Sequence, residues 1–99
     1  MPVEMLDENT ASLVAELFGA LSDTSRVRII SVLAKGERNV SSLAHAVGIS
    51  ESAVSHQLRG LRQLRLVRAR KQGRQVFYCL DDKHIVDLFQ RGLDHVLHS

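Results

Sequence analysis

Apolar residues recur at intervals of three and four along the first part of the chain. This period predicts an amphipathic helix over 10–21. A second helix is expected to begin at Ser22 or Asp23, because short polar side chains suit the N-cap of a helix. Gly36 is expected to end this second helix. The amino-terminal third of the protein therefore reads as two successive helices.

The helical period continues on both sides of a glycine within the segment 40–64. A short helix is predicted over 40–47, and Gly48 closes it because glycine readily adopts the left-handed backbone found at many helix ends. A second helix follows, with apolar residues on one face and small polar and basic residues on the other. Two helices joined by a short turn that contains glycine are typical of a helix-turn-helix, whose second helix lies in the major groove of DNA.

After this segment the apolar period changes from about 3.6 to 2. Leu66–Arg70 and Gln75–Leu80 are predicted to be strands, and the sequence K-Q-G-R between them to be a tight turn in which Gly73 takes a positive φ. The segment 66–80 would then be a β-hairpin directly after the second helix of the pair, the recognition helix. A hairpin in this position is called a wing and is suited to contacting phosphates or the minor groove of DNA. The basic residues expected at its tip are Arg70, Lys71 and Arg74.

These elements predict a mainly α fold with a β-hairpin, a winged helix-turn-helix that occupies 1–99 as a single domain. A chain of 99 residues that is 44% apolar builds only a modest core, and such small domains often gain stability by pairing. We therefore expect a homodimer formed through the terminal helices at 10–21 and 82–98. The chain has no apolar run long enough to cross a bilayer and its amino terminus does not resemble a signal peptide, so we expect a cytoplasmic protein with no membrane partner.

The charge distribution indicates a nucleic-acid partner although the net charge is only +2. Seven Lys and Arg residues and no Asp or Glu lie between Ser52 and Leu80. A segregated positive field of this kind attracts a polyanion, whereas a merely solvated surface usually mixes both signs. The residues expected to read base edges are Ser52, Ser55, His56 and Gln57. The residues expected to reach bases or phosphates are Arg59, Arg62, Arg70, Lys71 and Arg74.

The last helix is expected to begin near Lys83, with Asp81 or Asp82 as its N-cap. Within it, His84 and His95 are eleven residues apart, which places them on one face at about 100° per residue. They are also about 16 Å apart along the helix axis, so one ion cannot touch both.

An antiparallel pair of these helices would resolve that separation. Asp82 and His84 of one copy would meet His95 and His98 of the other, so that each dimer holds two equivalent metal sites. Imidazole and carboxylate ligands in this number suit tetrahedral Zn(II), although Co(II) or Ni(II) is possible. The alternative is a set of ordinary surface histidines on a polar helix face. The single cysteine, Cys79, excludes a thiolate-built site and is expected to be a buried structural thiol in the second strand.

The chain resembles the ArsR/SmtB family of metal-responsive repressors from Leu13 to His98. Three stretches carry the resemblance, namely L-S-D-T-S-R-V-R-I-I-S-V-L, E-S-A-V-S-H-Q-L-R-G-L-R and L-V-R-A-R-K-Q-G-R-Q-V-F-Y, together with the tail pattern D-x-H-x10-H-x2-H. The resemblance implies a repressor that binds its operator without metal and is released by metal bound at Asp82, His84, His95 and His98, so that genes for metal efflux or sequestration are transcribed. The start of the third helix reads E-R-N-V-S-S-L-A-H, without the cysteines of the family's thiolate sensors.

Two other functions could use the same residues. A zinc enzyme would need an open coordination position and a general base, and the sequence contains no phosphate loop or nucleophile elbow, so we expect no catalysis and no small-molecule substrate. The second alternative is a DNA-binding regulator whose metal is structural or incidental and whose signal is something else.

Overall fold

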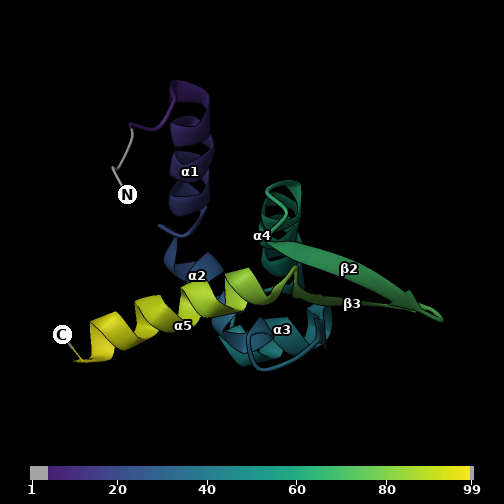
Figure 1. Cartoon of the computed structure of the whole chain (residues 1–99). Helices are drawn as coiled ribbons and strands as arrows, with labels where there is room; N and C mark the ends of the chain where they lie inside the picture. Colours follow the sequence, from purple (N-terminus) through teal and green to yellow (C-terminus); the bar gives the residue numbers. More distant parts are fainter. Residues whose placement is uncertain (1–4, 99) are drawn as a thin grey trace.

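The computed structural model describes residues 5–98 as five helices and a three-stranded sheet (Figure 1). The elements in chain order are α1 (Glu8–Ala20), α2 (Thr24–Leu33), β1 (Arg38–Asn39), α3 (Val40–Val47), α4 (Glu51–Gln63), β2 (Val67–Gln72), β3 (Gln75–Leu80) and α5 (Lys83–His98). The predicted winged helix-turn-helix is confirmed: α3 and α4 form the helical pair, and β2 and β3 form the hairpin. No helix within the described residues is long and apolar enough to cross a membrane.

Short polar side chains and a glycine set the ends of the helices around the turn. Asp23 caps α2 by accepting a hydrogen bond from the Arg26 amide at 3.1 Å. Gly48 ends α3 with a φ of 77°, a conformation that costs glycine little, and Ser50 begins α4 by accepting from the Ala53 amide at 3.0 Å. The turn between the two helices is therefore only three residues long, which fixes the direction of α4.

The sheet contains one strand more than the sequence predicted. Its strand order is β1-β3-β2, and β1 pairs antiparallel with β3 through Arg38 opposite Tyr78 and Asn39 opposite Phe77. A strand of two residues shows no alternation of apolar and polar positions, so periodicity could not reveal it.

The first strand of the hairpin begins one residue later and ends two residues later than predicted. The first strand does not span Leu66–Arg70 but continues to Gln72, which pairs with Gln75. The turn is therefore reduced to two residues, Gly73 and Arg74, and Gly73 has the expected positive φ, 62°. Cys79 is half-buried instead of fully buried.

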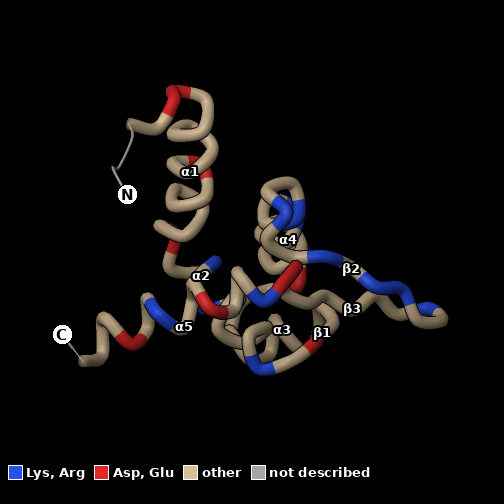
Figure 2. Tube along the Cα trace, in the orientation of Figure 1, with Lys and Arg blue, Asp and Glu red and all other residues tan. Residues whose placement is uncertain are grey.

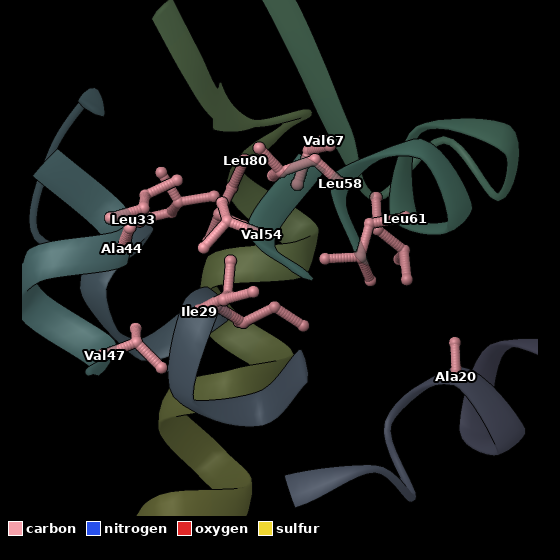
Figure 3. Close-up of a cluster of buried hydrophobic side chains, with 13 residues drawn as sticks. Ala20, Ile29, Leu33, Ala44, Val47, Val54, Leu58, Leu61, Val67 and Leu80 are labelled. Atoms are coloured by element: carbon pink, nitrogen blue, oxygen red, sulfur yellow. The ribbon is translucent and has the colours of Figure 1, made fainter. Parts of the chain in front are cut away.

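The core lies between α2, α3, α4 and the base of the hairpin (Figure 3). Each of the three helices contributes one apolar stripe, and the strands contribute residues only near the ends that meet the helices. The largest fully buried side chains are Ile29, Ile30, Leu43, Val54, Leu58, Leu61 and Leu66. The tip of the wing contributes nothing to this core and extends into solvent (Figure 1).

The helices α1 and α5 lie outside this core and extend away from it (Figure 1). No residue of α5 is buried, and α1 buries only Ala20. The Cα radius of gyration is 14.9 Å, whereas a compact chain of this length would have about 13 Å. The chain also exposes 7370 Å², roughly 30% more than expected for a folded monomer of its mass. Both quantities indicate surface that another molecule covers.

The position of α4 depends on its buried stripe, so truncating that stripe should destabilise the domain. Leu61 is 0% exposed, and we expect Leu61→Ala to reduce the free energy of unfolding by about 2–5 kcal/mol through lost burial and the cavity left behind. Urea denaturation followed by circular dichroism, at one protein concentration, measures the loss. Ser55→Ala on the exposed face of the same helix is the control, expected within about 0.5 kcal/mol of the parent. Equal stability of the two variants would contradict the assigned core.

Candidate nucleic-acid interface and metal half-sites

One face of α4 presents the side chains that the sequence assigned to DNA. Helical geometry at about 100° per residue places these residues together on the side opposite the buried stripe. All of them are exposed, namely Ser52, Ser55, His56, Arg59 and Arg62. Their hydroxyl, imidazole and guanidinium groups are free to approach base edges or phosphates, which is the chemistry of a recognition helix.

Gln57 lies differently from the five exposed residues of α4. It is half-buried on the flank of the helix, and its Oε1 accepts a hydrogen bond from Arg26 Nε at 2.7 Å. The guanidinium of Arg26 also lies beside Gly60. One of its terminal nitrogens is 3.8 Å from the position that a Cβ atom on Gly60 would occupy. The amide of Gln57 is therefore engaged in bracing α4 against α2. No local pattern in the sequence pointed to Arg26, because this hydrogen bond joins residues 31 positions apart.

Basic residues continue from α4 along β2 to the tip of the wing (Figure 2). Lys71 and Arg74 are exposed at or beside the turn, as predicted. Arg68 lies nearer the base of the hairpin, and its Nε donates to Cys79 Sγ at 3.3 Å. This contact raises the pKa of Arg68 above its ordinary value, so the side chain is a permanent cation. We call the exposed basic residues of α4 and the wing that make no ion pair within residues 5–98 the positive surface, namely Arg59, Arg62, Arg68, Lys71 and Arg74.

Arg70 does not lie free at the tip. Its Nε and one terminal nitrogen donate to the two carboxylate oxygens of Glu37, at 2.9 and 2.6 Å, and its guanidinium stands 5.4 Å from the centre of the Phe77 ring. The hydrogen bonds from Arg70 lower the pKa of Glu37, and Glu37 in turn raises the pKa of Arg70. The segment from Ser52 to Leu80 contains no acid in sequence, yet folding brings an acid from the loop before β1 onto it.

Asp82 and His84 come together at the start of α5. The Oδ1 atom of Asp82 accepts from the Ile85 amide at 3.1 Å, which is the N-cap contact predicted for Asp82. The same oxygen lies 3.6 Å from Nδ1 of His84. Because both side chains are exposed, a carboxylate oxygen and an imidazole nitrogen are available side by side for one ion.

His95 and His98 lie near the other end of α5, three positions apart on an exposed edge. Within residues 5–98 no group of three or more His, Cys, Asp or Glu side chains is close enough to hold a metal ion. One chain thus carries two donor pairs at opposite ends of a helix, and each pair is at most half of a four-ligand site. His45 and His56 are exposed on α3 and α4, away from both pairs.

An apolar groove of about 430 Å³ separates α5 from the helical core. It is bordered by Phe18 of α1, by Val27 and Ile30 of α2, and by Phe89 and Val96 of α5. Phe18 and Val96 are more than half exposed. Large apolar side chains gathered in this way mark a surface that normally meets another protein.

Known proteins resemble this chain over almost its whole length. Residues 23–69 match the family described as "Bacterial regulatory protein, arsR family". The transcriptional repressor SmtB homolog of Synechocystis sp. is 48% identical over 96 residues, which are 97% of this chain and 73% of that protein. The transcriptional regulator NmtR of Mycobacterium tuberculosis is 41% identical over 98% of this chain and 81% of its own length.

Solved structures show the same arrangement of elements. The solution structure of apo-NmtR superimposes with a TM-score of 0.82, at 41% identity, over 99% of this chain and 82% of that one. A homodimeric winged helix-turn-helix DNA-binding domain from Mycobacterium bovis also gives 0.82, at 29% identity, over 99% and 96% of the two chains.

Arg74 at the turn of the wing should contribute phosphate affinity without sequence preference. We expect Arg74→Ala to weaken binding to all duplexes and to make the slope of log K against log salt shallower by about 0.9, because one fewer counterion is released. Fluorescence anisotropy over a range of salt concentrations measures both effects. Lys83→Ala removes an equal charge at the start of α5 and should leave the slope unchanged. An identical slope for Arg74→Ala and its parent would remove Arg74 from the interface.

Proposed function

Because the chain belongs to the ArsR family of bacterial regulatory proteins, we propose that it is a metal-sensing repressor that binds operator DNA as a homodimer and is released by Zn(II). Family membership makes it a DNA-binding transcriptional regulator and not an enzyme, as the sequence indicated. We propose in addition which metal the protein binds, which residues bind it, and that metal binding releases the DNA. Its relative in Synechocystis is named a transcriptional repressor, which supports repression here.

The division of donors between the two ends of α5 carries the proposal. A carboxylate and an imidazole meet at Asp82 and His84, and two imidazoles follow at His95 and His98 about 16 Å further along the axis. Two copies of α5 running antiparallel would join these pairs into two complete sites. Such ligands suit zinc, which commonly takes four in a tetrahedron, and the donor set contains no thiolate that would favour softer ions.

The apolar groove supports the same pairing of chains. In the proposed dimer its walls, α1 and α5, meet the equivalent helices of the second copy, which would cover side chains such as Phe18 and Val96. The excess exposed area described above is of the size that a stable dimer buries. The terminal helices thus serve as the dimerisation elements, and the proposed metal ligands lie on one of them.

The groove also suggests how the two functions are coupled. Val27 and Ile30 of α2 line it, and the neighbouring residue Arg26 braces the recognition helix through Gln57. A shift of α5 on metal binding would therefore reach α4 through α2. For metal to release DNA, it must bind better to the conformation with low operator affinity, and DNA must then weaken metal binding by the same factor.

The direct experiment is a titration of Zn(II) into the metal-free protein bound to the DNA upstream of its own gene, at constant salt and followed by anisotropy. We expect release at about one ion per subunit, because each dimer would hold two sites. Co(II) and Ni(II) titrated in parallel rank the ions. Tight zinc binding with no change in DNA affinity would instead support a regulator whose metal is structural.

Removing the imidazoles at the carboxy-terminal end of α5 should separate metal sensing from DNA binding. We expect the His95→Ala, His98→Ala double variant to bind DNA as the parent does without metal, and to lose its response to zinc, since half of each site is gone. The same anisotropy titration gives both results. His45→Ala, which removes an exposed imidazole from α3, should respond normally. A double variant that zinc still releases would overturn the ligand assignment.

A further inference from the structure

Arg70 and Glu37 form a bidentate ion pair beside the positive surface, with side chains that are 50% and 34% exposed. The guanidinium donates in parallel to both carboxylate oxygens, at 2.9 and 2.6 Å, a geometry that is stronger and more directional than a single hydrogen bond. Its other terminal nitrogen donates to Gln72 at 3.0 Å, and the Phe77 ring lies beside it. The side of Arg70 that would grip a phosphate is already occupied.

The fold of the sheet holds Glu37 in this position. Glu37 immediately precedes β1, which pairs with β3 next to the register position of Arg70 opposite Phe77. Alternate residues of a strand point to the same face, so Arg68, Arg70 and Gln72 share one face of β2. Glu37 lies over that face, where its charge is felt by Arg68 as well as by Arg70. The acid therefore lies beside the wing because of the backbone and not because of a flexible side chain alone.

A phosphate that approached Arg70 would have to displace this carboxylate. If Arg70 turned to the phosphate, Glu37 would be left as an unpaired negative charge beside the DNA backbone. If Arg70 stayed, it would contribute a neutralised pair and release no counterion. In both cases the wing binds with fewer effective cations than its sequence contains.

We propose that Glu37 limits the affinity of the wing for DNA by holding Arg70 out of phosphate contact. Lys71 and Arg74 are then the cations of the wing that meet the backbone. Glu37 should lower the affinity for every DNA sequence by the same factor, because phosphate contacts carry no sequence information. The inference rests on the proposed role as a DNA-binding repressor. Limited affinity would also help the repressor to be released. An allosteric ligand changes DNA affinity by about 5–150-fold, and a repressor with too many phosphate contacts would stay bound after that change.

The test compares Glu37→Gln with the parent on the upstream DNA and on an unrelated duplex of equal length, by anisotropy over a range of salt concentrations. Glutamine retains the shape and one hydrogen-bond acceptor but removes the charge. We expect several-fold tighter binding to both duplexes by the same factor, and a slope of log K against log salt that is steeper by about 0.9. Glu8→Gln in the first turn of α1 is the matched change of charge and should alter neither quantity.

A double-mutant cycle assigns the effect to Arg70. Arg70→Ala should change DNA affinity little in the parent, where the guanidinium is neutralised, but should abolish the gain in the Glu37→Gln background. A gain that survives Arg70→Ala, a gain confined to the upstream DNA, or weaker binding by Glu37→Gln would each overturn the proposal. The parent protein in the same series tests the proposed repressor function. If the parent binds the upstream DNA and zinc releases it, a Glu37→Gln variant with the same DNA affinity as the parent refutes only the role of Glu37.

Discussion

The burial of one stripe of α4 is the constraint on which the rest of the structure depends. Val54, Leu58 and Leu61 are almost completely excluded from solvent between α2, α3 and the base of the hairpin. A helix that buries one face must expose the opposite one, so the packing of these three residues aims the polar and basic face outward. Only three residues separate α4 from β2, so the basic residues of the wing follow those of α4 closely along the chain. The outward polar and basic face of α4 is therefore a consequence of what the core requires.

A single chain leaves large apolar side chains of α1 and α5 exposed to solvent. A core built from three short helices cannot also cover α1 and α5, and both present large apolar side chains beside an open groove. The proposed metal donors follow this division, because each end of α5 carries only one pair. In the proposed dimer, pairing of the chains and metal binding would use the same helix. An ion bound between two copies of α5 would then act on the relative position of the two chains. In this arrangement no separate sensing domain is needed.

Local patterns in the sequence revealed most of the fold. The helical period, the cap at Asp23 and the left-handed Gly48 were all readable because each depends on residues a few positions apart. The strand β1 was not, since two residues have no period. The first strand of the hairpin was predicted to end two residues early, because polar residues near the tip hide the alternation. The outward face of α4 also followed from helical geometry. The pairing of Asp82 with His84 followed instead from the non-helical N-cap position predicted for Asp82. The dimer itself lies beyond what one chain displays.

What the sequence concealed were the contacts between distant side chains, and they change the interpretation of the site. Gln57 was expected to read a base, yet Arg26 from α2 holds its carbonyl oxygen; Arg70 was expected to meet phosphate, yet Glu37 holds its guanidinium. Both partners lie about thirty positions away, so no local charge count could include them. A positive segment in sequence is therefore only an upper limit on the positive surface of the folded protein. The effective positive field depends on which cations the fold neutralises. In the wing, the pairing of β1 with β3 places Glu37 beside Arg70, and β1 is too short to predict from the sequence.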